Sequence, residues 1–389
     1  MDTRTVNRIT SIDILRGLVM VIMALDHTRD FFHITAFTDD PLNLATTTVP
    51  LYFTRWITHF CAPTFVFLAG TSAYLASQNK ASNVAGNFLI KRGLWLVFIE
   101  VAVITLAFTF NPLYNFIIWQ VIWATGWSMV VLGLLMRFNF YAILGIGLVL
   151  FFGHNVFDFI TLPQNGTSGT LMKILFTAQD TILSLSPDRA IGDFYAILPW
   201  TGVMLTGYCA GAWYGAGCHA AKRKRLLLTT GSTLIALFLV LRYFNIYGDP
   251  LPWDKQHLLS FLNTNKYPPS LLYLCMTLGP ALIALALLEN VSTAVSRVIS
   301  TYGRVPFFYY VLHFYLIHIL TVVAFYLSGY GAADIVDKQV PFLFRPQHFG
   351  FGLAAVYAIW LGVVAALYLP CKWFNNYKLT HSQWWLKYL

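Results

Sequence analysis

The chain has 389 residues, of which 58% are hydrophobic, 17% aromatic and only 11% charged. Its mean hydropathy of +0.63 excludes a soluble globular protein and indicates a polytopic membrane protein. The formal net charge of +9 does not indicate nucleic-acid binding, because the Lys and Arg residues fall in short loops between apolar runs, where membrane topology accounts for them. The 5 cysteines are scattered without paired spacing, so neither a disulfide framework nor a metal site is predicted.

Runs of about twenty apolar residues predict an all-α fold with ten transmembrane helices in a single domain, residues 1–389. The predicted spans are 13–33, 51–76, 88–109, 114–136, 139–153, 192–216, 226–244, 270–288, 304–328 and 349–371. Most Lys and Arg residues lie on the side that holds both chain ends, which predicts that both termini are cytoplasmic. The predicted external segments are 154–191, 245–269 and 329–348.

The first span carries charge at both ends of an apolar middle. Arg16 lies at the predicted cytoplasmic end, and the external end holds Asp26, His27, Arg29, Asp30 and His33. At roughly 100° and 1.5 Å per residue, Arg16 and His27 point to within about 20° of the same face and lie about 16 Å apart along the axis. Ionisable residues inside a membrane indicate function; a cluster of ion pairs that only stabilises the helix end is the alternative.

The second and third spans each contribute two residues of interest. Pro63 frees the carbonyl of His59, four residues earlier, which predicts a kinked and polar backbone near the depth of His27. Lys91 and Arg92 open the third span at the cytoplasmic side. This pair fits either positive-inside topology or a clamp for an anionic cofactor, because Arg offers a forked donor to phosphate and Lys a mobile charge.

Polar side chains inside the later spans need partners. Gln120 lies in the fourth span and His313 in the ninth. A single buried histidine is more often a satisfied core residue than a ligand, so His313 has a structural reading beside the functional one. Together with Arg29 and His59, these two residues are the candidates for binding a substrate.

The first-helix pattern Arg-x-x-Ser-x-Asp-x-x-Arg-Gly at residues 8–17, followed by His27, resembles the signature of transmembrane acyltransferases. Its Arg-x10-His spacing is similar to that of the acyltransferase family 3 enzymes, in which the motif carries the catalytic histidine. The run Phe65-Val-Phe-Leu-Ala-Gly and the ten-helix pattern resemble more closely the bacterial relatives of heparan-alpha-glucosaminide N-acetyltransferase.

This resemblance implies an acetyltransferase of the bacterial plasma (inner) membrane. Cytoplasmic acetyl-CoA is then the donor, and a hydroxyl or amine of an external sugar, glycan or small molecule is the acceptor. A general base is needed to remove the acceptor proton, and His27 is the preferred candidate, oriented by Asp26 or Asp30. The lysosomal enzyme has an asparagine at the place of His27 and its active histidine a little later, so the resemblance makes His33 the second candidate.

The same resemblance implies which residues bind the acetyl donor. The residues expected to bind acetyl-CoA are Arg16, Lys91 and Arg92. No metal is implied. The partners are therefore the lipid bilayer, acetyl-CoA and the acceptor, while the oligomeric state stays open between a monomer and a homodimer.

A second class of function is a proton-coupled secondary transporter or flippase of a small solute or lipid, which would use intramembrane Asp, His and Arg. The sequence shows no inverted repeat, and no ionisable residue sits at the middle of spans four to eight, where a coupling site is expected. Release of CoA that depends on an acceptor would distinguish the enzyme from the transporter.

Overall fold

The computed structural model describes residues 9–160, 163, 166–178 and 181–388, so Arg8 of the first-helix motif lies outside the described residues. The predicted all-α polytopic membrane fold is confirmed, with one small sheet added. Six helical segments within the described part are long and apolar enough to cross a membrane: Val49–Ser77, Phe140–Phe159, Ala220–Phe244, Leu271–Leu288, Pro306–Leu327 and Leu353–Thr380. The count of ten crossings and the cytoplasmic termini stay predictions.

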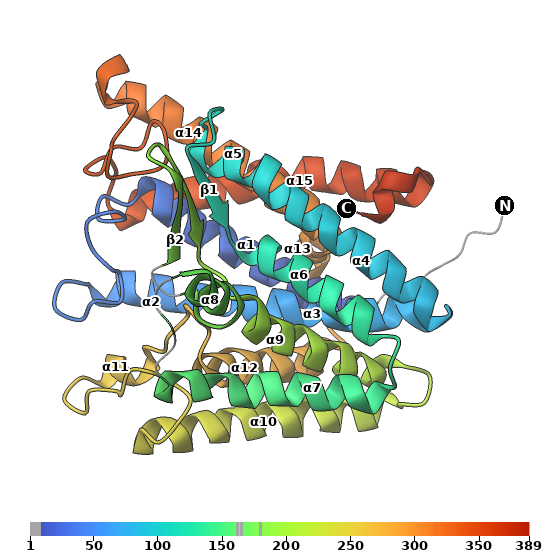
Figure 1. Cartoon of the computed structure of the whole chain (residues 1–389). Coiled ribbons are helices and arrows are strands. Elements are labelled where there is room, and N and C mark those ends of the chain that lie inside the picture. The colour runs from blue at the N-terminus through green and yellow to red at the C-terminus, as the bar shows by residue number, and fades with distance from the viewer. Residues whose placement is uncertain (1–8, 161–162, 164–165, 179–180, 389) are drawn as a thin grey trace.

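The long helices run alongside one another (Figure 1). The α-helices are α1 (Thr10–Phe32), α2 (Val49–Thr58), α3 (Cys61–Ser77), α4 (Ser82–Ile99), α5 (Thr105–Thr109), α6 (Val121–Leu135), α7 (Phe140–Gly153), α8 (Gly166–Met172), α9 (Ile197–Ala210), α10 (Ala220–Phe244), α11 (Leu258–Leu262), α12 (Leu271–Leu288), α13 (Ala294–Arg304), α14 (Pro306–Leu327) and α15 (Leu353–Thr380). The π-helical turns are η1 (Glu100–Ile104) and η3 (Lys173–Thr177), and the 3-10 turns are η2 (His154–Phe159), η4 (Gly211–Tyr214), η5 (Ala332–Asp334) and η6 (Trp384–Lys387).

The first and last long helices are antiparallel neighbours. His33, directly after α1, forms a parallel bridge with Phe351, directly before α15. Further along, the Trp360 indole Nε1–H donates to the carbonyl of Val21 at 2.8 Å. The start of α1 and the end of α15 therefore lie at the same end of the bundle, as an even number of crossings requires.

The fourth predicted span, 114–136, is wrong at its beginning. Residues Phe116–Trp119 form the strand β1, and α6 starts only at Val121. β1 pairs in parallel with β3 (Arg189–Asp193), which pairs on its other side, antiparallel, with β2 (Thr181–Ser186). The aromatic and β-branched residues of β1 suit an extended strand, but its partner lies some 70 residues later, beyond the reach of a local pattern.

The helix α13 lies mostly between the predicted spans 270–288 and 304–328. It is too short and too polar to be predicted as a transmembrane helix. It packs closely on α1. A Cβ atom on Gly303 would lie 1.9 Å from the carbonyl oxygen of Asp13, and one on Gly17 would lie 2.0 Å from that of Ile299. Only glycine fits at these two positions, and the contact brings Arg304 to the Arg16 end of α1.

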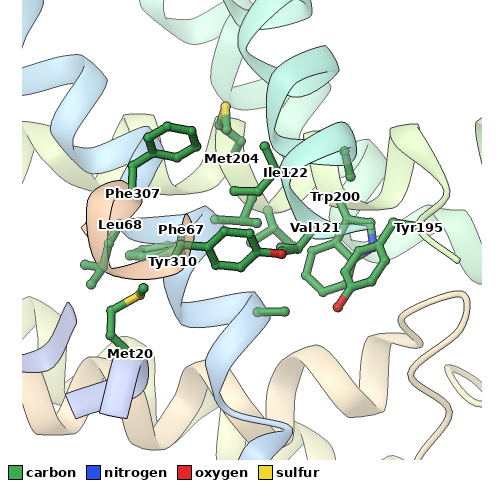
Figure 2. Packing of buried hydrophobic residues seen from close by; sticks show 14 of the residues in the cluster. Met20, Phe67, Leu68, Val121, Ile122, Tyr195, Trp200, Met204, Phe307 and Tyr310 are labelled. Atoms are coloured by element: carbon green, nitrogen blue, oxygen red, sulfur yellow. The ribbon is translucent and has the colours of Figure 1, made fainter. Parts of the chain in front are cut away.

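The predicted kink in the second span is confirmed. α2 ends at Thr58 and α3 begins at Cys61, and the carbonyl of His59 accepts a hydrogen bond from the Tyr273 hydroxyl at 2.8 Å. The buried apolar core surrounds this break and the middle of α1. Figure 2 shows part of it, with Met20 of α1 and side chains from α3, α6, α9 and α14 that belong to the same core.

Candidate functional site

Three cavities follow one another along α1. The Arg16 cavity has a volume of about 250 Å³ and is lined on α1 by Arg16. The His27 cavity is much smaller, about 40 Å³, and both Asp26 and His27 line it. The Arg29 cavity has a volume of about 500 Å³ and is lined by Arg29 and Asp30. The order of the cavities is thus the order of the residues along the helix.

Neighbouring cavities share lining residues. Phe65 lines both the Arg16 cavity and the His27 cavity. Lys266 lines both the His27 cavity and the Arg29 cavity. On α1, Met20 and Met23 lie between Arg16 and His27 and line the small middle cavity. The face predicted from helical geometry is therefore the side of α1 that faces this series of cavities.

Five cations from different elements line the Arg16 cavity: Arg16, Lys80, Arg92, Arg304 and Lys378. All five were predicted to be cytoplasmic. The guanidinium of Arg16 donates to the Ser72 hydroxyl at 2.6 Å and to the Gly303 carbonyl at 3.2 Å. The buried Nε of Arg92 has no hydrogen-bond partner among the described residues. Such a concentration of guanidinium and ammonium groups suits a phosphate-bearing ligand.

Lys91 and Arg92 do not share one site. Arg92 faces the Arg16 cavity, whereas Lys91 is exposed and is not among the residues that line this cavity. The two residues are adjacent in α4, so about 100° of helical rotation separates them. Of the two residues, only Arg92 is therefore placed to contact a ligand in the Arg16 cavity.

His27 bonds to His313 rather than to a carboxylate. Nδ1 of His27 lies 2.7 Å from Nε2 of His313, whose own Nδ1 lies 3.2 Å from the carbonyl oxygen of Tyr309. A carbonyl only accepts, so Nδ1 of His313 carries the proton and Nε2 of His313 is the acceptor. Nδ1 of His27 must then donate, which leaves the lone pair of a neutral His27 on Nε2.

Asp26 and Asp30 pair with arginines. Arg29 Nη2 lies 3.2 Å from Asp26 Oδ1 and 2.5 Å from Asp30 Oδ1, and Arg55 Nη1 lies 2.5 Å from Asp26 Oδ2. Lys266 lies 4.0 Å from the same Asp26 oxygen. Asp26 therefore connects α1 to α2 and to the loop before α12. The Nδ1–H of His27, which was expected to be oriented by Asp26 or Asp30, donates to His313 instead.

His33 stands apart from the three cavities. It is buried at the end of α1, where its Nδ1 lies 3.0 Å from the Thr35 hydroxyl. Its carbonyl accepts a hydrogen bond from Arg345 at 2.8 Å. It is not among the residues that line the cavities along α1, so the structure gives His33 contacts that hold the helix end.

Gln120 and Glu100 meet at the edge of the His27 cavity. Gln120 lines this cavity, and its backbone N–H donates to Oε1 of Glu100 at 2.8 Å. Glu100 is fully buried at the start of the π-helical turn η1, and its Oε2 has no hydrogen-bond partner among the described residues. An acidic residue inside an apolar run and a π-helical turn both occur often at functional sites. The first signal was present in the sequence and was missed.

The Arg29 cavity combines both signs of charge. Besides Arg29 and Asp30 it is lined by the charged residues Asp39, Asp40, Arg55, Arg242 and Lys266. His59 also lines it, is buried, and neither of its ring nitrogens has a hydrogen-bond partner among the described residues. Burial alone would raise the pKa of Tyr267 at the rim, but the positive charges of Lys266 and Arg55 outweigh burial and lower it.

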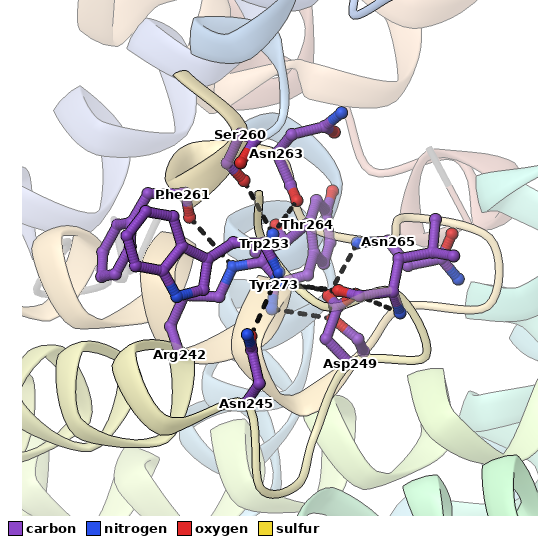
Figure 3. A network of polar contacts seen from close by, with 12 residues as sticks. Arg242, Asn245, Asp249, Trp253, Ser260, Phe261, Asn263, Thr264, Asn265 and Tyr273 are labelled. Carbon is purple, nitrogen blue, oxygen red and sulfur yellow. Dashed lines mark hydrogen bonds and ion pairs between the residues drawn. The ribbon is translucent and has the colours of Figure 1, made fainter. Parts of the chain in front are cut away.

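The loop 245–269 at this cavity is held by one arginine. Figure 3 shows Arg242 close to Ser260, Phe261 and Asn263 of the loop. Arg242 donates to the backbone carbonyls of these three residues and to that of Leu251. Asp249 pairs with Arg242 at 3.7 Å and accepts hydrogen bonds from the Asn265 N–H and the Ser270 hydroxyl. Because Lys266 belongs to the same loop, the network positions a residue that lines two cavities.

The heparan-alpha-glucosaminide N-acetyltransferase catalytic family model matches residues 8–243, more than half of the chain. The chain belongs to this family. A search of the curated proteins finds no match. The heparan-alpha-glucosaminide N-acetyltransferase family is a family of membrane acetyltransferases, so the prediction from the first helices is confirmed at this level. The similarity of the Arg16 to His27 spacing to acyltransferase family 3 stays a prediction.

The family match covers the α1, α3 and α4 sides of the cavities, including Arg16, His27 and Arg92. Two further residues lie beyond the matched segment: Lys266 of the loop before α12, which lines two of the cavities, and His313 of α14, which contacts His27. Several lining residues are not singled out by the sequence, where they count only among the Lys and Arg residues that indicate topology: Arg55, Lys80, Lys266, Arg304 and Lys378. The number of charges in each loop predicts on which side of the membrane the loop lies, but not whether a given side chain faces a cavity.

Proposed function

We propose that the protein transfers an acetyl group from acetyl-CoA, bound in the Arg16 cavity, to an amine or hydroxyl of an acceptor bound in the Arg29 cavity. The observation that supports this proposal is the order of the three cavities along α1. A cationic cavity, a small cavity with a histidine and a large polar cavity follow one another. This is the order that donor, reaction centre and acceptor need.

The Arg16 cavity suits the donor because CoA carries phosphates and a long flexible arm. Arg92 offers a guanidinium Nε at the cavity that has no hydrogen-bond partner in the described part of the chain. The arm would then follow α1 past Phe65 and Met20 toward His27, over the roughly 16 Å that separate Arg16 from His27 along the helix. Lys91, being exposed, is left out of the donor site.

His27 is the proposed general base. Its Nε2 lone pair takes the proton from the acceptor as the acceptor nitrogen or oxygen attacks the thioester carbon, and the imidazolium then returns this proton to the leaving CoA sulfur. His313 positions His27 through the 2.7 Å contact and fixes which nitrogen is basic. Gln120 lines the same cavity and is proposed to contact the acceptor there.

The Arg29 cavity suits a small polar acceptor such as a sugar. Its volume of about 500 Å³ and its mixture of carboxylates and cations offer both hydrogen-bond acceptors and donors to hydroxyl and amino groups. Two of these contacts would come from Arg29 and from His59, whose ring nitrogens have no hydrogen-bond partner within the described residues. We expect this cavity to lie on the external side, as the predicted topology has it, and the membrane to be the bacterial inner membrane, as the family resemblance implies.

The test is the release of CoA from acetyl-CoA by the purified full-length protein in nanodiscs, with a panel of amino sugars, neutral sugars and simple amines. Acceptor-dependent release, with the acetylated acceptor identified by mass spectrometry, supports the proposal. Movement of a solute across proteoliposomes that needs a proton gradient, without release of CoA, would instead support the transporter that the sequence alone left open.

A further inference from the structure

The buried hydroxyl group of Tyr310 is not explained by the contacts described above. The residue lies on α14 and is only 1% exposed, and its hydroxyl has no hydrogen-bond partner among the described residues. Tyr310 lines the His27 cavity. In Figure 2 its hydroxyl points toward Val121, which lines the same cavity. Burial of an unpaired hydroxyl costs free energy and calls for an explanation.

The other hydroxyl groups at this cavity are already used. Thr58 donates to the carbonyl of Arg55 at 2.7 Å, and the Tyr195 side chain forms a hydrogen bond with Tyr267. Tyr310 is also close to the proposed base, because its ring and that of His27 lie 6.5 Å apart between centroids and at 85° to each other. One cavity thus presents a basic nitrogen and an unpaired O–H group.

We propose that the Tyr310 hydroxyl stabilises the oxyanion that forms during acetyl transfer. This inference rests on the proposed function. When the acceptor nitrogen or oxygen forms its bond to the thioester carbon, the π electrons of the carbonyl move to its oxygen, and the Tyr310 O–H donates to that oxygen. The electrons return as the carbon–sulfur bond breaks, and the CoA sulfur receives the proton from His27. The hydroxyl therefore gains its partner in the transition state.

The test compares the wild-type protein with Tyr310→Phe, which removes only the hydroxyl. Loss of one oxyanion donor typically lowers kcat about 10²–10³-fold, and we expect that loss in the release of CoA with KM for acetyl-CoA within about two-fold. Because the hydroxyl has no hydrogen-bond partner in the part of the chain that the structure describes, the thermal unfolding temperature should stay equal or rise.

The matched control is Thr64→Val. The Thr64 hydroxyl is also buried and without a hydrogen-bond partner among the described residues, but Thr64 lines none of the three cavities. Its loss should leave kcat unchanged. A Tyr310→Phe protein with wild-type kcat, with a change only in KM, or with a lowered unfolding temperature would overturn the inference, as would an equal loss in Thr64→Val.

The outcomes also separate this inference from the proposed function. A wild-type protein that releases no CoA with any acceptor would overturn the proposed function, and this inference with it. An active wild type together with an equally active Tyr310→Phe protein would overturn only the role of Tyr310.

Discussion

Nδ1 of His27 and Nε2 of His313 lie 2.7 Å apart, although 286 positions separate the two residues in the chain. The backbone carbonyl of Tyr309 sets the direction of this pair, since it accepts from His313 and thereby makes His27 the donor. The two rings are also stacked, with centroids 5.0 Å apart. A neutral histidine held in this way keeps a basic nitrogen available inside a buried site.

Substitution of His27 by alanine is expected to leave the protein folded and able to bind acetyl-CoA, and to lower the rate of acetyl transfer by about 10²–10⁴-fold, the usual contribution of a positioned general base. The measurements are single-turnover release of CoA and equilibrium binding of acetyl-CoA to the same preparation.

His33→Ala is the control, because His33 contacts Thr35 and lies outside the cavities. We expect its rate to fall much less than that of His27→Ala. Full activity in a well-folded His27→Ala protein together with a large loss in His33→Ala would reverse the assignment and favour the arrangement of the lysosomal enzyme.

Arg92 and Lys91 offer a neighbouring pair that tests the donor site. Arg92→Ala should weaken acetyl-CoA binding about ten- to a hundred-fold, because a hydrogen bond to a charged group contributes about 1.5–3 kcal/mol. Lys91→Ala removes the same charge from an exposed position one residue away and should change binding less than two-fold. Isothermal titration with acetyl-CoA measures both. Equal effects would mean that the charge acts only through topology.

The sequence was sufficient to predict what helical geometry determines. The spacing of Arg16 and His27 along α1 predicted the face that lines the Arg16 and His27 cavities, since one helix has one period. Pro63 likewise predicted the break at His59, because a proline leaves the carbonyl four residues earlier without its helical hydrogen bond. Both conclusions depend on a single segment and need no knowledge of its neighbours.

What the sequence could not predict depends on contacts between distant segments. Asp26 was expected to orient His27, but Arg55 from α2 reaches its carboxylate across the helix interface. The partner of His27 comes from α14. The strand β1 was predicted as helix, because its pairing with β3 is not visible in its own residues. The periodicity of one segment predicts which side chains share a face of its helix, whereas the packing of the whole chain decides which other helix that face contacts.

Arg242 is expected to be essential for the loop 245–269. It is 2% exposed and pairs with Asp249 while it donates to four loop carbonyls. Arg242→Leu leaves the buried Asp249 without its ion pair, which typically costs about 3–5 kcal/mol. Because the loop carries Lys266, KM for the acceptor should rise as well. Lys255→Ala, an exposed change in the same loop, should affect neither the unfolding free energy nor KM.

The small volume of the His27 cavity predicts the length of the acyl group. A volume of about 40 Å³ accommodates about three water-sized groups, which equals the three heavy atoms of an acetyl group. Each additional methylene would have to fit into this small cavity and is expected to lower kcat/KM about 10–200-fold. Propionyl-CoA and butyryl-CoA should therefore be progressively poorer donors than acetyl-CoA.

Met23→Ala should relax this preference, because Met23 lines the cavity and its truncation removes three heavy atoms. We expect the ratio of kcat/KM for acetyl-CoA to that for propionyl-CoA to fall by about ten-fold or more, while binding of CoA itself is unchanged. Met276→Ala removes the same atoms from a buried position on α12 that lines none of the three cavities, so it should keep the wild-type ratio. If the ratio stayed constant in Met23→Ala, the cavity beside His27 would not be the place where the acyl group reacts.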